Sequence, residues 1–438
     1  MLKRIDTVSV KAPPGAATRA RVFAFIRFSL VAWACIHFAL IAITGFTYVR
    51  SFAFGFAAVF ALWLVLGAIF SDNEPIPIPD TYLWAALALW AGWSTASYFW
   101  SVHPAYTKAE LGTEVGWGLV TAAIYYVAAR TGVSFRAMVT TAVAVAAALA
   151  LLAIDAVLTG AGADPEKMLV RTHGGVGAFS TYLVLVLPIL PLLLAARPMG
   201  YGTNRWSVAG VGFVFVLLLV AARVTENRMI WLAFAMGFIA FAVLASWRWR
   251  NRLVRAPWRW TSILLVLLVA VGTLFIDAAM QRAKTDRSQD KSVAQLIADD
   301  PRLVLWQHTF ERIRERPWTG FGFGKSILRT ELSGEMGDPM LAHAHNVFVS
   351  QWLQTGVIGV AALVALLAAL VWRYAAFMRG KDGMLAAIGV AGLVVLVAFV
   401  VKNLTDDFMM RPTSKEFWAI NALLIDYGIR RERAGDSG

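Results

Sequence analysis

The sequence predicts an all-α polytopic membrane protein with about 12 transmembrane helices and one large loop on a single side of the bilayer. Of its 438 residues, 59% are hydrophobic and only 15% are charged. A soluble domain of ordinary composition is about 45–50% apolar and about 25% charged. The apolar residues also fall in blocks of roughly 18–25, long enough to cross about 30 Å of hydrocarbon as helices.

Twelve apolar blocks are expected to cross the membrane. They are residues 27–49, 53–70, 81–100, 113–130, 136–158, 176–196, 206–223, 229–246, 261–277, 345–371, 383–401 and 416–429. The first block is long and others follow it, which favours a signal anchor over a cleaved signal. The expected organisation is an N-terminal arm (1–26), nine spans (27–277), the large loop (278–344), three spans (345–429) and a short tail (430–438).

Basic residues orient these spans. The stretch "WRWRNRLVRAPWRW" (247–260) separates spans eight and nine and is typical of an inner-leaflet anchor with interfacial tryptophans. Placing it in the cytoplasm puts most basic residues of the short loops, and both termini, on that side. The net charge of +13 then indicates contacts with anionic membrane lipids, and we expect no nucleic-acid partner. The single cysteine, Cys35, excludes an intrachain disulfide.

The large loop contains a helix signal. In "ADDPRLVLWQHTFERIRERPWTGFGFG" (298–324), an aspartate precedes Pro301 and Pro317 follows, which predicts an amphipathic helix over about 300–316. Its apolar stripe is expected to consist of Leu303, Trp306, Phe310 and Ile313. A loop of this length between spans usually has a function.

Arginines beside the stripe have two interpretations. Arg302, Arg312 and Arg316 form either a solvated face or, on an interfacial helix, a set of headgroup-level cations suited to a lipid-linked phosphate. We favour the second interpretation, most strongly for Arg302. Two other arginines, Arg223 and Arg228, flank the short outer connection "AARVTENRMIW" (221–231).

Together with Arg171, these make three arginines near the outer ends of spans. Snorkelling toward the headgroups explains any one of them, whereas convergence from separate helices would create an anion site, for which Arg228 is the best candidate.

The "GKS" at 324–326 is not a nucleotide-binding loop. That motif requires glycine five residues before Gly324, where Thr319 stands. A tight glycine-rich turn after the helix is the better interpretation, and its backbone amides are candidates for contact with phosphate.

The stretch "LAHAHNVFVSQWLQTGVIG" (341–359) places two histidines where a polar segment becomes apolar. One interpretation is a metal site, with Asp338 as the nearest third ligand; another is a structural histidine at the interface. The third is a general base: with span ten beginning near His345, the helix N-terminus and nearby arginines favour the neutral imidazole that proton abstraction requires. Asn346 would then orient His345 or the substrate, and His343 either assists it or merely adjoins it.

Three segments together resemble the O-antigen ligase and polymerase superfamily. They are "PRLVLWQHTFERIRERPWTGFGFG", "HAHN", and the spacing of ten residues from His345 to Gly356. "TENRMIWLAF" (225–234) is similar to the family's other arginine segment, although Asn227 stands in place of the usual serine. A further family stretch is only faintly matched by "GAFSTYL" (177–183).

The resemblance implies a fold like the GT-C class and a glycosyltransferase of the bacterial inner membrane with a periplasmic active site. It implies an undecaprenyl-diphosphate-linked glycan as donor, the lipid A core as acceptor, inversion at the anomeric carbon, and neither a metal nor another cofactor. His345 takes the position of the family's histidine, Arg302 that of the loop arginine and Arg228 that of the helix arginine.

Three alternatives stay open at this stage. An O-antigen polymerase and a protein O-oligosaccharyltransferase would use the same donor with another acceptor. The long loop, and the position of His345 late in the chain, favour the ligase. A soluble extension after the last span would point to the protein-glycosylating enzyme, and none is expected here. A secondary transporter or lipid flippase would also have about 12 spans, but we find no related halves and the polar candidates gather at one face.

Overall fold

The computed structural model describes residues 16–43, 46–70, 76, 79–159, 173–195, 204–253, 272–273, 301–337, 341–405, 407 and 409–436. Within these residues the chain is helical, with short connections and no strand. The helices of the first half are α1 (Ala16–Ala42), α2 (Thr47–Phe70), α3 (Thr81–Ala96), the 3₁₀ turn η1 (Ser97–Trp100), α4 (Pro104–Glu110), the π-helical η2 (Leu111–Gly116), α5 (Trp117–Ala128) and α6 (Gly132–Leu158).

The remaining helices are α8 (Val176–Val186), the 3₁₀ turn η3 (Leu187–Ile189), α9 (Leu192–Ala195), α10 (Arg205–Val224), α11 (Arg228–Leu253), α14 (Pro301–Glu315), α15 (Arg329–Met336), α16 (Val347–Arg379), α17 (Gly383–Asn403) and α18 (Arg411–Asp436). Eight helices in the described part of the chain are long and apolar enough to cross a membrane. The expected fold class, an all-α polytopic membrane protein, is therefore confirmed.

Not every expected span is one of these eight. The expected spans at 81–100, 113–130 and 416–429 are helical, as α3 with η1, η2 with α5, and part of α18. However, α3 has 16 residues and α5 has 12, while α18 carries charged residues along its length. The expected span at 261–277 lies outside the described residues, apart from two of them.

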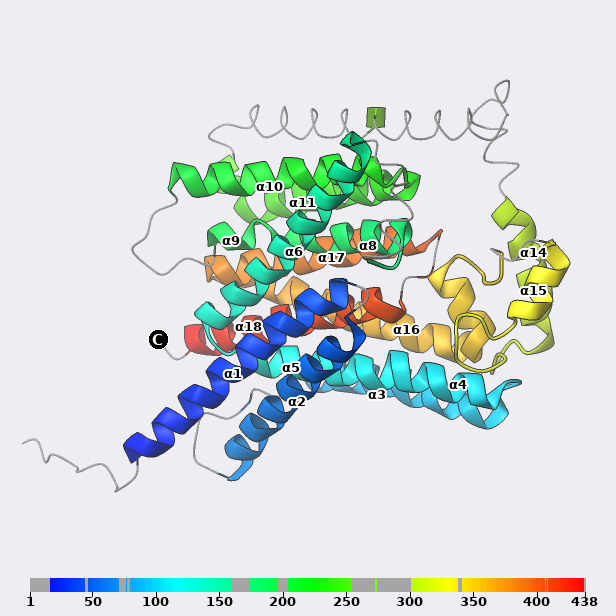
Figure 1. The fold of residues 1–438 in the computed structure, drawn as a ribbon, viewed down its shortest axis with the longest axis horizontal. Helices are drawn as coiled ribbons and strands as arrows, with labels where there is room; N and C mark the ends of the chain where they lie inside the picture. Colours follow the sequence, from blue (N-terminus) through cyan, green and yellow to red (C-terminus); the bar gives the residue numbers. More distant parts are fainter. Residues whose placement is uncertain are drawn as a thin grey trace, which may run out of the picture.

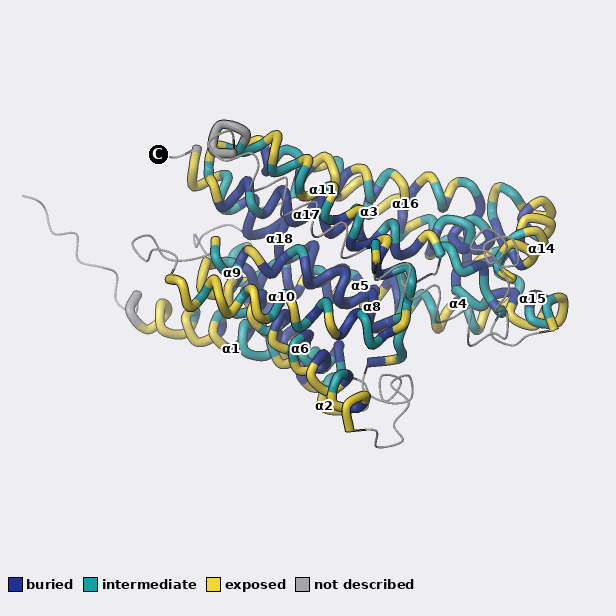
Figure 2. Tube along the Cα trace, turned by 90° about the horizontal axis from the view of Figure 1, so that it is seen from above, coloured by how far each residue is buried: buried dark blue, intermediate teal, exposed yellow. Residues whose placement is uncertain are grey.

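The core of the bundle is formed by α17, α18, α5 and α8, which are buried along most of their length (Figure 2). The outer helices α2 and α10 expose large apolar side chains, including Trp63 (60% exposed) and Phe213 (67% exposed). Lipid tails are as apolar as these side chains, so a membrane protein gains little by burying them in its own interior.

Different helices lie at the two ends of the bundle. The beginning of α1 and the end of α18 lie at one end, and α14 and α15 lie at the other (Figure 1). At the first end Arg248 donates hydrogen bonds to the carbonyls of Met378 and Gly380, both at 2.9 Å, and so satisfies the end of α16. Part of the basic stretch 247–260 therefore contacts another helix end.

Candidate active site

Helix α14 (Pro301–Glu315) lies where the loop sequence indicates a helix. Its buried face is not the expected stripe: Leu305, Thr309 and Ile313 are buried, whereas Leu303 is 42% exposed and Phe310 is 37% exposed. The reason is tertiary, because Leu305 and Ile313 pack into a small core with α15 and α16. The prediction for Leu303 and Phe310 is thus wrong by about one helix position.

This packing brings α14 to the histidine segment. The Trp306 indole nitrogen donates a hydrogen bond to the carbonyl of Ala344, at 2.6 Å. Ala344 is buried, and the rings of His343 and His345 on either side of it lie with centroids 3.8 Å apart and their planes tilted by 32°. Arg302 stands four residues before Trp306, and residues at this spacing share a helix face. The contact therefore places the helix that carries Arg302 beside the segment that carries His345.

His345 lies in front of α16 and not in its first turn. The helix begins at Val347, two residues after the start that the sequence suggested near His345. His345 has a φ of +47°, a left-handed conformation that is uncommon for a residue with a β-carbon and that is often found at functional sites. The helix cap must therefore be formed by a later residue.

That residue is Asn346. Its side-chain oxygen accepts hydrogen bonds from the amides of Phe348 and Val349, at 2.9 and 3.1 Å. Its side-chain nitrogen donates to the carbonyl of Leu404, at 2.9 Å, in the connection between α17 and α18. Because both ends of its side chain are engaged, Asn346 positions the backbone at His345, which is a different role from orienting the substrate.

Gly356 marks a break inside α16, with φ +71° and ψ −176°. A β-carbon at this position would lie 2.0 Å from the carbonyl oxygen of Trp318. The turn after α14 enters this break: the Val357 amide donates to the carbonyl of Pro317, at 2.9 Å. Gly356 thus has a packing role that couples α16 to the end of α14.

The glycine-rich turn uses its amides to hold the same break. The amides of Phe321 and Gly322 donate to the carbonyls of Leu353 and Gln354, at 3.0 and 2.8 Å, which a continuous helix would have paired internally. The Gly324 amide donates to the Gln354 side chain, at 2.9 Å. These amides have protein acceptors, so the structure does not support the idea that the turn contacts phosphate.

Arg312 and Arg316 have other partners. Arg312 donates to Glu315, at 3.0 Å, and to Glu335 of α15, and these two carboxylates raise its pKa. Arg316 lies over the ring of Phe321, 5.2 Å from its centroid, and its guanidinium reaches the carbonyl of Trp100. Both arginines therefore stabilise the packing of the loop segment, and we do not retain them as diphosphate ligands.

Arg223 lies in the last turn of α10, and Arg228 begins α11. Between them Asn227 accepts a hydrogen bond from the Met229 amide, at 3.1 Å, and donates to the hydroxyl of Ser180 in α8, at 3.2 Å. The asparagine that replaces the family's usual serine thus ties this connection to α8. The connection lies at the same end of the bundle as α14 (Figure 1). Arg171 lies outside the described residues, as does Asp338, the third residue of the metal interpretation.

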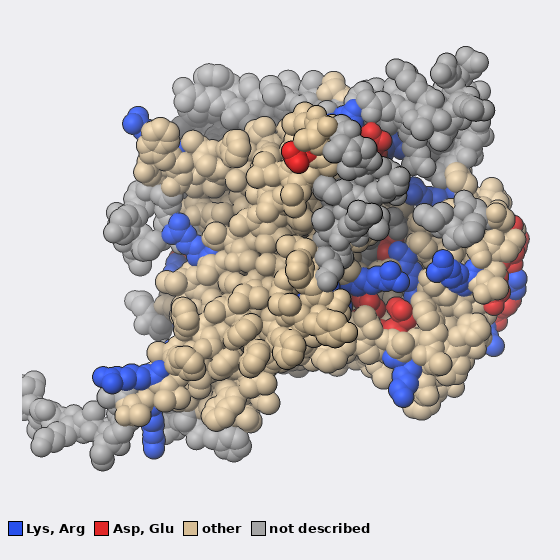
Figure 3. Space-filling view, viewed as in Figure 1, with Lys and Arg blue, Asp and Glu red and all other residues tan. Residues whose placement is uncertain are grey.

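Sequence reasoning missed the polar groups of α4 and of the connection before α18. Acidic and basic side chains gather in the hollow beside the end that carries α14 and α15 (Figure 3). Lys325 donates to the carbonyl of Asp407, at 2.7 Å, and the Ser326 amide donates to the hydroxyl of Tyr106, at 3.0 Å. Burial raises the pKa of Tyr106, and it also raises the pKa of Glu110, where Arg411 acts in the opposite direction.

Tyr106 and Ser326 are 220 positions apart in the chain, and Lys325 and Asp407 are 82 positions apart. The signal in the sequence was therefore limited to a cluster of polar residues in the short connection between spans at 101–112.

Comparison with known proteins matches the part of the chain that carries most of these candidate residues. The sequence model of the family described as O-Antigen ligase matches residues 213–364. The resemblance to the superfamily is therefore confirmed. The match begins in α10, ends in α16, and contains every candidate site residue except Arg171. Members of the O-antigen ligase family are glycosyltransferase-type ligases, in agreement with the coarse expectation for this chain.

A curated relative gives a second finding. The chain is 29% identical over 198 residues to a protein of Acinetobacter baylyi named "General O-oligosaccharyltransferase". The alignment covers 42% of this chain and 33% of the relative. The O-antigen ligase family is thus supported from two directions, while donor and acceptor belong to the proposal below.

Proposed function

We propose that this protein transfers a glycan from undecaprenyl diphosphate to a sugar hydroxyl of the lipid A core, at the periplasmic face of the bacterial inner membrane. The observation that supports the proposal is the contact between Trp306 and Ala344, which brings the helix that carries Arg302 to the segment that carries His345. The positive-inside rule supports the orientation, because Arg248 of the basic stretch and the end of α18 lie at the opposite end of the bundle.

In the proposed mechanism the arginines act on the leaving group. Arg302 and Arg228 bind the diphosphate and offset the negative charge that develops on its oxygen as the bond to the anomeric carbon breaks. Guanidinium groups suit this task because they remain charged and offer paired donors to phosphate oxygens. The diphosphate is already an activated leaving group, so the reaction requires no nucleoside triphosphate.

His345 acts on the acceptor. Its imidazole takes the proton of the attacking sugar hydroxyl while that oxygen forms the new bond to the anomeric carbon from the opposite side, which inverts the configuration. The products are the glycosylated acceptor and undecaprenyl diphosphate, and the proton remains on His345 until solvent removes it. The ring of His343, whose centroid lies 3.8 Å from that of His345, would restrict the orientation of the His345 imidazole.

A reconstituted reaction tests the proposal. Purified protein in detergent is mixed with undecaprenyl-diphosphate-linked glycan and with either lipid A core or an unfolded acceptor protein. Transfer to the core lipid supports the proposal, and His345→Ala and Arg302→Ala are expected to abolish it while Arg312→Ala retains it. Full transfer by a correctly folded His345→Ala variant would exclude the base assignment, and activity that is lost in chelator would contradict a metal-independent reaction.

The second candidate function is protein glycosylation, because the aligned relative is named a general O-oligosaccharyltransferase. It predicts transfer to the acceptor protein and none to the core lipid in the same assay. Neither outcome requires a sealed vesicle, whereas a transporter or flippase would show no activity without one.

A further inference from the structure

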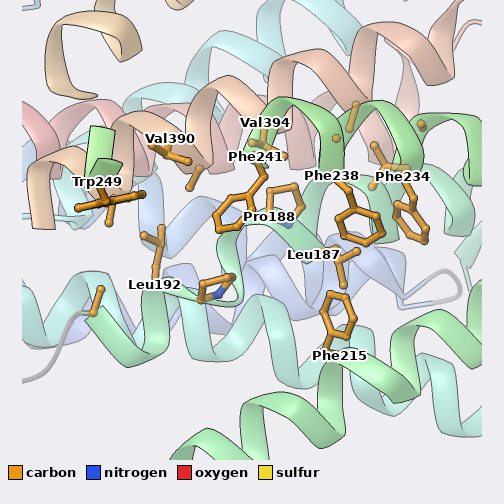
Figure 4. Close-up of a pocket in the computed structure, with 18 residues that line it drawn as sticks. Leu187, Pro188, Leu192, Phe215, Phe234, Phe238, Phe241, Trp249, Val390 and Val394 are labelled. Carbon is orange, nitrogen blue, oxygen red and sulfur yellow. The ribbon is translucent and has the colours of Figure 1, made fainter. Parts of the chain in front are cut away.

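An apolar groove runs along α11, away from the candidate active site. It encloses about 320 Å³ and is lined by apolar side chains from α8 to α11 and from α17 (Figure 4). Phe234, Phe238 and Phe241 of α11 form one wall, with Leu187 and Pro188 of η3 facing them. Phe241 is 42% exposed, so the groove opens to the lipid side there.

Prolines create the space for this groove. Helix α8 ends at Val186, and Pro188 and Pro191 lie in the η3 turn and in the short connection to α9. Proline lacks an amide hydrogen and cannot continue an α-helix, so the wall opposite α11 recedes at this level. On the α17 side the lining residues include Ala387 and Ala391, whose small side chains leave the groove unfilled.

The position of the groove relative to Arg228 indicates which kind of molecule it can bind. Arg228 begins α11, and Phe234 follows six residues later, which is roughly 9 Å along a helix. The lining continues to Trp249, roughly 22 Å further toward the other end of the bundle. An apolar path that starts below a candidate diphosphate ligand and runs along the membrane normal suits one long hydrocarbon chain attached to that diphosphate.

We propose that this groove binds the part of the donor's polyprenyl chain that follows the first isoprene units and thereby positions the diphosphate at Arg228. The inference rests on the proposed function. The polyprenyl chain gains little free energy by leaving the bilayer for an equally apolar groove. The groove therefore contributes to the reaction by orienting the diphosphate. A phospholipid acyl chain is the competing occupant, and it would bind without regard to the diphosphate.

Photo-cross-linking tests the occupant. A photoreactive phenylalanine analogue is placed at position 238 in the groove or, as a control, at Phe213, which is 67% exposed on α10 and is not part of the groove. The protein is reconstituted in vesicles of phosphatidylethanolamine and phosphatidylglycerol with radiolabelled undecaprenyl diphosphate. The proposal predicts labelling from position 238, not from 213, and competition by unlabelled undecaprenyl diphosphate.

Cross-links from position 238 only to phospholipid or to the protein itself would overturn the proposal. This measurement needs no glycan transfer, so its outcome is separate from that of the proposed function.

A filling variant tests the consequence. Ala391→Phe narrows the groove, and Ala368→Phe makes the same change at an exposed position of α16. For a long-chain donor, Ala391→Phe is expected to raise KM about tenfold, with no effect on a donor of two isoprene units. Equal KM values for Ala391→Phe and wild type with the long-chain donor would refute the proposal that the groove binds the polyprenyl chain. Absence of transfer by the wild type would instead refute the proposed function.

Discussion

Replacing Gly356 by alanine should release the glycine-rich turn from the break in α16. The backbone at Gly356, with φ +71° and ψ −176°, lies in a region that essentially only glycine adopts. An added β-carbon would also lie 2.0 Å from the Trp318 oxygen and 2.4 Å from the Thr319 nitrogen. Both contacts are with backbone, so no side-chain rotation relieves them.

The cost can be worked out from these contacts. Forcing a residue with a β-carbon into this conformation costs about 1–3 kcal/mol. Moving the turn away weakens the hydrogen bonds from the amides of Phe321 and Gly322 to α16, each with a net contribution of about 1 kcal/mol. The local opening free energy should therefore fall by about 3–5 kcal/mol, and the exchange of these two amides should accelerate by at least about 100-fold.

Hydrogen exchange followed by mass spectrometry on peptides that cover 317–324 measures this change. The control is Gly210→Ala in α10, where nothing lies within 4 Å of an added β-carbon and the helix should become slightly more stable. Exchange in Gly356→Ala within about threefold of wild type would show that the turn does not depend on the break, and the reasoning would be refuted.

Three other predictions concern the candidate site. Asn346→Ala removes the cap of α16 and should lower stability by about 1 kcal/mol together with kcat. Asn346→Ser keeps a capping oxygen and loses only the hydrogen bond to Leu404, so it should lose less stability than Asn346→Ala; equal losses in both variants would contradict the capping role. Trp306→Phe removes the hydrogen bond to Ala344 and should reduce kcat more than it changes donor KM, so an unchanged kcat would separate α14 from the histidine segment. Arg312→Ala breaks partly exposed ion pairs and should cost below about 1 kcal/mol with donor KM unchanged, while Arg302→Ala should raise donor KM at least about tenfold; the reverse order would place the diphosphate at Arg312.

The family resemblance rests on positions whose roles the tertiary structure explains. The spacing from His345 to Gly356 separates a left-handed residue before α16 from a glycine-only break within it. In the sequence this spacing was one sign of a family, and the structure shows that His345 and Gly356 both adopt unusual backbone conformations. The break also explains the glycine-rich turn, because Phe321 and Gly322 pair with the carbonyls that the break leaves open.

By itself the sequence determined what depends on local composition: a multi-span helical membrane protein and a helix that begins at Pro301. It also determined the resemblance to the O-antigen ligase family, over a range that includes His345, Arg302 and Arg228. Only the tertiary structure decided which face of α14 is buried, which arginines have carboxylate or backbone partners, and what Asn346 contacts. The physical reason is that burial and hydrogen bonding depend on which other elements pack against a helix, as α15 and α16 do against α14. The partners of Arg312, Asn346 and Gly356 come from other parts of the chain, where local pattern carries no information about them.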